Sequence, residues 1–279
     1  MSRALGILQG RLGRVALLDM DASLVTHAHR GCHVLLKVGG ADTFFDVRGE
    51  MCPLTDRSAV LVNAWEPHAY NHQAHAPQTH ILALYIEPEW LGEMDRQFGC
   101  AGHARFFPHS CVSISREIRE RAQSLGQQML ASDPASQEAG EALVFDLMKE
   151  VISGFADHKS LRLAPEISWM ADFRIRRAVR LMHERLHLSF DAADIARAAG
   201  LSRPHFFSRF RAVTGLTPAL FFNTLRMEAA TRKLVSGAAA MADVGRELGF
   251  DAPANFTRFF RQQQGVAPSE YRRVAHYVG

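Results

Sequence analysis

Short apolar runs separated by turn residues follow one another in the first third of the chain. Between about residues 15 and 90 the runs cover 34–38, 44–47, 59–63 and 80–86, with Gly, Pro, Asp and Asn between them. Short apolar runs bounded by such breakers are typical of β-strands. The pattern therefore predicts a unit built from antiparallel strands.

The apolar spacing then changes to a helical period. Residues 114–130 and 138–155 read as two amphipathic helices joined by the breaker SDPAS, with Leu143, Leu147 and Val151 on one face of the second. We expect a helical hairpin over residues 113–157. Residues 158–170 have no strong period and predict a linker, and short helices follow from Asp172.

A repeat of about fifty residues lies in the last segment. The stretches 193–218 (ADIARAAGLSRPHFFSRFRAVTGLTP) and 242–268 (ADVGRELGFDAPANFTRFFRQQQGVAP) share their spacing of small, aromatic and turn residues. Gly200 and Gly249 match at an offset of 49 residues, whereas Phe206 and Phe256 match at an offset of 50. The second copy therefore carries one extra residue in its turn.

Each copy has the pattern of a helix-turn-helix. A short helix, 192–199 or 241–248, precedes a glycine that can adopt a left-handed backbone conformation. Ser202 or Asp251 is then the expected N-cap of a second helix, which ends at Gly215 or Gly265 before a proline. The sequence thus predicts two helix-turn-helix motifs, at about 191–214 and 241–264.

The two halves of the chain carry opposite net charges. Residues 1–160 contain 14 Lys and Arg against 19 Asp and Glu, whereas residues 161–279 contain 18 against 10, and seventeen of these 18 cations are Arg. The planar guanidinium suits phosphate oxygens and guanine edges. The C-terminal half is therefore predicted to bind a polyanion.

On these motifs, residues 171–275 resemble the DNA-binding domain of the AraC/XylS family of bacterial transcription regulators. The connecting segment FFNTLRMEAATRKL and the closing GVAPSEYRR are part of the resemblance. It implies two helix-turn-helix subdomains whose second helices enter successive major-groove faces of one double-stranded DNA segment. A connecting helix over 218–235 would span about 27 Å, comparable with the helical turn of DNA, about 34 Å.

Helical spacing gives each second helix a buried face and an outward face. Phe206 and Phe210 face inward in the first copy, and Phe256 and Phe260 in the second. Arg258 could fork onto guanine and Asn255 onto adenine, each contributing about 1–3 kcal/mol of discrimination. The expected DNA contacts are Arg203, Pro204, Phe207, Ser208 and Arg211 in the first helix, and Pro253, Asn255, Thr257, Arg258 and Arg261 in the second.

Nine of the 14 histidines lie between residues 27 and 109. The segments THAHRGCHVLLKVGG and VLVNAWEPHAYNH resemble the cupin-like effector domain of many AraC-family regulators, a small antiparallel β-barrel. The resemblance places His27, His29 and His33 in the first metal-binding cupin motif, with His where an acidic ligand is usual. His68 stands in the second motif, whose Pro-x-Gly part is absent. Cys32 should face away from His33, because side chains alternate along a strand.

Two roles stay open for these histidines. Imidazoles are suitable ligands for a divalent metal ion, so His27, His29, His33 and His68 are candidate ligands of a metal that regulation itself does not require. The same residues, together with Trp65, could instead line a pocket for a small-molecule effector, or hydrogen-bond within the core.

The sequence thus predicts an α+β chain of several parts: a cupin-like barrel at 1–112, the hairpin at 113–157, the linker at 158–170 and a helical DNA-binding domain at 171–275. The resemblance implies a regulator without a catalytic step that binds promoter DNA as a homodimer, with Leu143, Leu147 and Val151 packed against a partner helix. RNA polymerase would be a further partner of an activator. The chain lacks an apolar stretch of about 18 residues, so we expect a cytoplasmic protein that does not enter a membrane.

Two other functions remain open from the sequence. The first is a metal-dependent cupin enzyme, an isomerase or a dioxygenase, that uses the histidine set. The second is an architectural DNA-binding protein that responds to no effector.

Overall fold

Two β-sheets form the N-terminal region of the computed structural model, which describes residues 2–10, 13–73, 75–87, 106–131, 134–157, 172–237 and 239–277. The larger sheet has the strand order β10-β1-β2-β8-β3-β6-β9, and the smaller has the order β5-β4-β7. The predicted antiparallel strands are confirmed, but they are divided between two sheets. The strands are β1 (Arg3–Gly10), β2 (Gly13–Met20), β3 (Cys32–Gly40), β4 (Thr43–Val47), β5 (Glu50–Leu54), β6 (Ser58–Val62), β7 (His68–Asn71), β8 (Thr79–Ile86), β9 (Cys111–Ser113) and β10 (Ala275–Tyr277).

The larger sheet is buried on both faces. On β3, Val34 and Leu36 pack toward the helical hairpin, whereas Leu35 packs into the core shared with the smaller sheet. The Cys32 side chain lies on the face of β3 that packs toward the hairpin, whereas His33 contacts His68 of the smaller sheet. The alternation along β3 therefore separates Cys32 from His33, as predicted.

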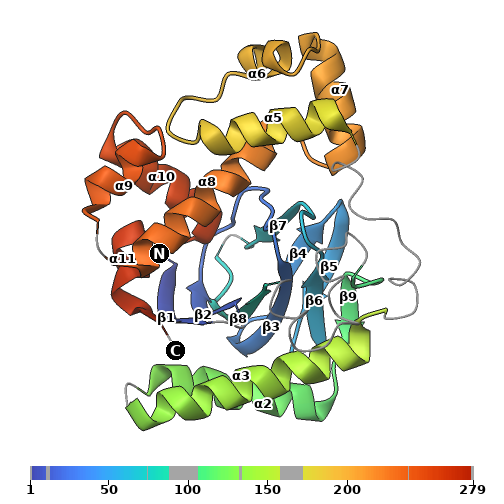
Figure 1. Ribbon diagram of the computed structural model, residues 1–279. Helices are drawn as coiled ribbons and strands as arrows, with labels where there is room; N and C mark the ends of the chain where they lie inside the picture. Colours follow the sequence, from blue (N-terminus) through green and yellow to red (C-terminus); the bar gives the residue numbers. More distant parts are fainter. Residues whose placement is uncertain are drawn as a thin grey trace.

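Helices α2 (Arg116–Leu130) and α3 (Pro134–Phe155) form the predicted hairpin and lie across one face of the larger sheet (Figure 1). Helix α3 begins four residues earlier than expected, because a proline is well tolerated in the first helical turn. Leu147 and Val151 are fully buried against the sheet of their own chain, and Leu143 is partly buried there. The expectation that Leu147 and Val151 pack against a partner protomer is therefore wrong, since the apolar cluster of their own chain already buries them, whereas the expectation for Leu143 stays a prediction.

Seven helices make up the described C-terminal region: α5 (Phe173–Glu184), α6 (Ala192–Ala198), α7 (Arg203–Thr214), α8 (Pro218–Val235), α9 (Met241–Glu247), α10 (Pro253–Gln264) and α11 (Pro268–Val274). Gly200 and Gly249 have φ of 72° and 75° in the two turns, and Gly215 and Gly265 have 77° and 78° after the second helices. The two copies of the repeat thus use the same left-handed turns and helix ends. The long connecting helix spans the predicted residues.

The N-caps of the second helices differ from the expectation. Ser202 occupies the N-cap position of α7 but its side chain makes no capping hydrogen bond, and Ala252 rather than Asp251 precedes α10. Both helices carry a proline in their first turn. Proline presets the helical φ and removes one N–H that would otherwise need a cap, so the helices can begin without one.

The first helix-turn-helix unit has its own core, whereas the second shares its core with the sheets. Phe206, Phe210 and Phe221 are buried among α5, α6, α7 and α8. Phe256, Phe260 and Tyr271 belong instead to the apolar cluster that includes Ile7 and Leu35. Strand β10, directly after α11, pairs parallel with β1 at the edge of the larger sheet. The end of the described chain therefore completes the N-terminal sheet.

The expected linker at 158–170 lies outside the described residues, so the domain boundaries stay predictions. Among the helices that are described, none is both long and apolar enough to cross a membrane.

Candidate DNA-binding surface and histidine cluster

The outward face of α7 is built mostly as predicted. Arg203, Ser208 and Arg211 are exposed, as is Pro204, while Phe206 and Phe210 are fully buried. Phe207 is only half-exposed, because its ring packs edge-to-face on Phe206 at a centroid distance of 6.0 Å. The polar contacts expected of α7 are accessible, whereas Phe207 partly supports the core of the unit.

On the outward face of α10, the two residues expected to read bases, Asn255 and Arg258, are hydrogen-bonded to each other. Arg258 Nη2 donates to Asn255 Oδ1 at 3.0 Å, and both side chains are exposed. Pro253 and Arg261 are also exposed, and Thr257 is half-buried. The amide oxygen of Asn255 therefore orients the guanidinium of Arg258.

One arginine of α7 has a structural role that the sequence did not reveal. Arg209 Nε donates to Asp172 Oδ2 at 2.6 Å, and the same carboxylate caps α5 by accepting from the N–H groups of Arg174 and Ile175. Partial burial tends to raise the pKa of Asp172, but these hydrogen bonds outweigh it and leave that pKa lowered. Arg209 thus joins α7 to the start of α5. The sequence signal that could have indicated this role is Asp172, a residue type favoured as an N-cap, directly before the first helix of the C-terminal region.

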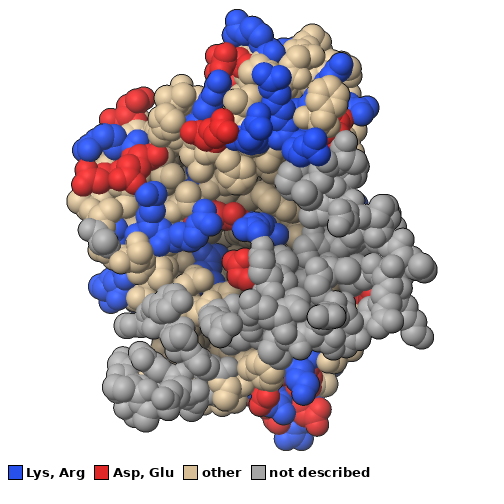
Figure 2. Space-filling view, viewed as in Figure 1, with Lys and Arg blue, Asp and Glu red and all other residues tan. Residues whose placement is uncertain are grey.

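Basic side chains gather over the first helix-turn-helix unit. Figure 2 shows Lys and Arg crowded at the top of the molecule, where Figure 1 places α5, α6 and α7. Exposed residues of this surface include Arg174, Arg177 and Arg180 on α5 and Arg203 and Arg211 on α7. A concentration of arginine on one part of the surface is the electrostatic footprint expected of a nucleic-acid binder.

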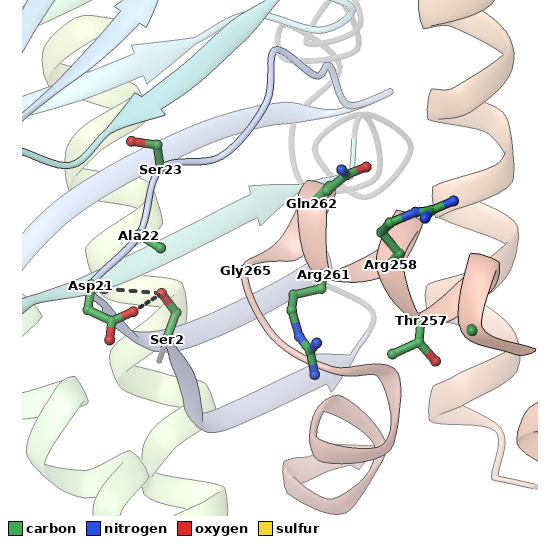
Figure 3. Close-up of a pocket in the computed structure, with 10 residues that line it drawn as sticks. Ser2, Asp21, Ala22, Ser23, Thr257, Arg258, Arg261, Gln262 and Gly265 are labelled. Carbon is green, nitrogen blue, oxygen red and sulfur yellow. Dashed lines mark hydrogen bonds between the residues drawn. The ribbon is translucent and has the colours of Figure 1, made fainter. Parts of the chain in front are cut away.

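A pocket separates the outward face of α10 from the N-terminal region. It has a volume of about 610 Å³, and Thr257, Arg258 and Arg261 line one wall while Ser2 and Asp21 line the opposite one. Figure 3 shows the two arginines extending from α10 and the hydrogen-bonded Ser2 and Asp21 across the pocket. The candidate reading face of α10 is therefore bordered by the chain's own N-terminal region.

Contacts beside the pocket hold this arrangement. The N–H of Val25 donates to the carbonyl oxygen of Gln262 at 3.3 Å. Gly265 approaches Met20 and Leu24 so closely that a Cβ atom on the glycine would lie 2.9 Å from the Met20 methyl carbon. The second helix-turn-helix unit thus docks on the segment that follows β2.

Four histidines come together between the two sheets, as the sequence predicted. The rings of His27, His29 and His68 have pairwise centroid distances of 4.3–5.1 Å. His33 lies beside them and stacks on Tyr85 at 4.1 Å. All four histidines are buried, and burial is the largest cause that lowers their pKa values, to about 4 for His27 and well below the ordinary value for the other three. The cluster is therefore neutral at pH 7.

Neighbouring carbonyl groups fix the protonation of two of these rings. His27 Nδ1 lies 2.8 Å from the carbonyl oxygen of Val25, and His68 Nδ1 lies 2.9 Å from that of Glu66. A carbonyl oxygen only accepts, so Nδ1 carries the hydrogen in both rings and Nε2 keeps its lone pair. His29 Nε2 and His33 Nε2 are buried without a hydrogen-bond partner in the described part of the chain.

Trp65 and Glu66 border the cluster but face other partners. The Trp65 ring stacks on Phe221 of α8, with a centroid distance of 4.5 Å and an interplanar angle of 5°. The Glu66 carboxylate accepts from the N–H of Asn63 at 2.8 Å and from Arg48 at 3.1 Å. Trp65 thus connects the histidine cluster to the helical C-terminal region, whereas Glu66 is already engaged.

Known proteins resemble the C-terminal region most strongly. A family model described as a helix-turn-helix domain matches residues 195–274. The MmsAB operon regulatory protein of Pseudomonas aeruginosa is 38% identical over 92 residues, which are 33% of this chain and 30% of that protein. The transcriptional activator RhaS of Shigella sonnei is 22% identical over 254 residues, or 88% of this chain and 86% of that one. The chain thus spans less than a third of the first relative and most of the second.

Solved structures share the arrangement of the whole chain. Apo ToxT from Vibrio cholerae superposes with a TM-score of 0.56 at 13% identity, covering 93% of this chain and 96% of that one. ToxT with a bound unsaturated fatty acid gives a TM-score of 0.51 at 12% identity, covering 98% and 95%. This likeness concerns the fold, a β-rich N-terminal region followed by a helical C-terminal region. Together with the tandem helix-turn-helix units and their repeated glycines, these similarities show that the C-terminal region is a helix-turn-helix domain similar to those of AraC-like transcription regulators.

Proposed function

We propose that this protein is a sequence-specific transcription regulator that binds double-stranded promoter DNA and responds to an effector held in its N-terminal region. The observation that carries the proposal is the tandem arrangement of α7 and α10, each with an exposed arginine face, at the two ends of the 18-residue helix α8. Such a helix is about 27 Å long. Two reading helices at that separation suit successive major-groove faces of one duplex.

The exposed residues of the two helices divide into two kinds of contact. Arg258 and Asn255 are the candidate base readers. To reach the base edges, either the hydrogen bond between them breaks or the two side chains turn together. Arg203, Arg211 and Arg261 are the candidate phosphate contacts, with Ser208 and Thr257 beside them. Pro204, Phe207 and Pro253 would offer only apolar contact. These roles follow from exposure and side-chain chemistry.

The effector site belongs to the N-terminal region in this proposal. The two sheets take the place of the expected cupin-like barrel in this proposal, and His27, His29, His33, His68 and Trp65 are the candidate effector-binding residues. In the relative ToxT, a bound unsaturated fatty acid is present in one solved structure. The histidines of this chain offer a different chemistry, and a divalent metal ion is a candidate ligand for them.

The regulator acts as a homodimer in this proposal, and as a partner of RNA polymerase if it activates transcription. The face of α3 that carries Leu147 and Val151 is covered within the chain, so dimerisation requires another surface. Sedimentation of the intact protein with and without DNA measures this directly.

A metal-dependent cupin isomerase or dioxygenase is the alternative, and one observation weighs against it. A carboxylate is a common general base and metal ligand, and Glu66, which borders the cluster, is held by Asn63 and Arg48. The tandem helix-turn-helix units would also have no role in such an enzyme.

The test is genome-wide capture of DNA bound by the intact protein and by the Arg258→Ala variant. We expect a recurrent sequence motif that is lost or relaxed in the variant. Arg116→Ala is the matched control, because Arg116 is an exposed arginine on α2, remote from α10 (Figure 1). Recovery of random sequences by the wild-type protein, unchanged by Arg258→Ala, would refute the proposal.

A further inference from the structure

We propose that His27, His29 and His68 bind a single divalent transition-metal ion, and that this ion is the effector to which the DNA-binding region responds. The effector role of the ion rests on the proposed function, because the ion can regulate DNA binding only if the protein binds DNA. The metal site itself stands on the geometry of the histidines alone.

The three histidines converge on a space of ionic size. Each offers one ring nitrogen, and these three atoms all lie within 4.8 Å of one another. Nitrogens bound to one tetrahedral ion at about 2.0–2.1 Å lie about 3.3 Å apart, so small ring movements close the set around a metal. Reciprocal backbone hydrogen bonds between His27 and His68, both 2.9 Å long, hold these two side chains on the same side.

The hydrogen bonds around the rings are those of metal-binding histidines. A ligating imidazole usually donates its second N–H to a carbonyl or carboxylate, which orients the ring and leaves the other nitrogen free for the metal. His27 and His68 both do so through Nδ1, to the carbonyl oxygens of Val25 and Glu66. His29 Nε2 is a buried polar atom without a described partner. A bound ion would satisfy that nitrogen, whose isolation otherwise destabilises the fold.

The donor set selects the class of metal. Glu66 is engaged elsewhere, and Cys32 lies on the opposite face of β3, so imidazole nitrogens are the available ligands among the residues that the structure describes. Imidazole suits Zn²⁺, Co²⁺, Ni²⁺ and Cu²⁺, whereas Mg²⁺ and Ca²⁺ require oxygen ligands. His33 lies beside the three ligands, with its Nδ1 at 3.4 Å from His68 Nε2.

An aromatic ring separates the buried guanidinium of Arg14 from the site, although the positive charge of Arg14 still lowers the pKa of His27, His29 and His33. The guanidinium carbon of Arg14 lies 3.5 Å from the centroid of Tyr85, and His33 stacks on Tyr85 at 4.1 Å. Two groups at these distances cannot share one face of the ring, so Tyr85 lies between Arg14 and the histidines. A divalent ion therefore does not contact the guanidinium.

The segment that carries the ligands also contacts helix α8. The carbonyl oxygen of His29 accepts from the N–H of Trp65 at 2.7 Å, and the Trp65 ring stacks on Phe221. Trp65 has a φ of 61°, a strained conformation for a bulky residue that these two contacts hold in place.

Two further contacts continue from the same segment. Ala28 is buried in the core of the first helix-turn-helix unit, and the N–H of Arg30 donates to Glu228 of α8 at 2.8 Å. An ion that draws His27 and His29 toward His68 therefore moves residues packed on α8, the helix that joins the two units. Metal binding would shift the relative placement of α7 and α10 through these contacts.

The experiment for the metal site is titration of chelator-treated, full-length protein with Co²⁺. We expect one ion per chain and the visible absorption of low-symmetry Co²⁺, displaced by Zn²⁺. His29→Ala and His68→Gln should each weaken the affinity by more than about 100-fold. His187→Gln is the control, since His187 is exposed and lies outside the cluster. Absence of stoichiometric binding by the folded wild-type protein overturns the proposal, even if a variant fails to fold. Binding that survives in folded His29→Ala protein overturns it too.

The experiment for the response is DNA affinity of the wild-type protein with and without Zn²⁺, measured by anisotropy of a labelled captured sequence. We expect a change of about 5- to 150-fold, the usual range of coupling between sites, and a smaller change in Trp65→Ala. Metal binding with an unchanged DNA affinity overturns the effector role. Metal binding by a protein that recognises no DNA sequence would instead refute the proposed regulator, so the two failures are distinguishable.

Discussion

Arg14 on β2 donates a hydrogen bond from Nη1 to the Tyr271 hydroxyl on α11 at 2.8 Å, and both side chains are buried. The two residues are 257 positions apart in the sequence. The contact lies beside the pairing of β10 with β1. The second helix-turn-helix unit is therefore fastened to the N-terminal sheet through buried groups, and a change at this junction bears on both the stability and the orientation of the reading helices.

Tyr271→Phe should lower the free energy of unfolding by about 1–3 kcal/mol, because it leaves a buried guanidinium without its hydroxyl partner. Arg14 Nε already lacks a partner in the described residues, and the guanidinium keeps its contact with the Tyr85 side chain, whose ring centroid lies 3.5 Å away. Urea unfolding followed by circular dichroism measures the loss. Arg273→Ala, an exposed position of the same helix, should change the stability by less than about 0.5 kcal/mol. Equal effects of the two substitutions would contradict a stabilising role of the hydrogen bond between Arg14 and Tyr271.

Gly249→Ala should destabilise the protein more than Gly200→Ala, although the two glycines occupy matching turns. Both have positive φ, which costs an alanine on the order of 1 kcal/mol. A Cβ on Gly200 would meet nothing within 4 Å, whereas one on Gly249 would lie 2.6 Å from Arg226 Nη2 and 2.8 Å from the carbonyl carbon of His187. Thermal unfolding of the two variants in parallel gives the difference, and a larger loss for Gly200→Ala would show that packing at Gly249 is looser than described.

Glu228 should make stability depend on pH near neutrality. Burial raises the pKa of its carboxyl group to about 7, against an ordinary value of 4.5. The folded state therefore holds this proton more tightly than the unfolded state, so the contribution is fully present below about pH 4.5 and is lost as the pH rises through 7. The loss should be on the order of 2 kcal/mol.

Urea unfolding at pH 5, 6, 7 and 8 tests this dependence, with Glu228→Gln as the comparison. The glutamine cannot ionise, so the difference between wild type and variant should change in favour of the variant as the pH rises. A difference that stays constant across this range would exclude Glu228 as the titrating group.

Leu24→Asp should increase affinity for DNA by several fold. Leu24 packs near Gly265 at the contact that places α10 across the pocket from Ser2 and Asp21. A charge at this partly buried position weakens that contact, which frees the face of α10 that carries Arg258 and Arg261. Anisotropy with a captured DNA sequence measures the change. Val25→Asp adds the same charge at a neighbouring side chain that is 43% exposed and should leave the affinity nearly unchanged. Weaker binding by Leu24→Asp would mean that docking supports DNA recognition.

Local signals in the sequence were sufficient to predict the repeat, its glycine turns, the alternation along β3 and the span of α8. The glycines at 200, 215, 249 and 265 adopt the left-handed turns that their positions required, because a positive φ is a local property of the backbone. The alternation of Cys32 and His33 and the span of α8 were also correct, since strand and helix periods extend over a few residues only. The convergence of the four histidines was implied by the resemblance to the cupin motifs, which places His68 beside His27, His29 and His33.

Only the tertiary structure decided which faces meet. Nothing in the local pattern pairs β10 with β1 or joins Arg14 to Tyr271, because such contacts depend on residues more than two hundred positions apart. For the same reason Leu147 and Val151 were assigned to a partner protomer although their own sheet covers them. An apolar stripe shows that a face must be buried, and the packing of the whole chain determines by what. Tertiary packing also turned the arginine face of α10 toward the N-terminal region and brought the histidine segment against α8.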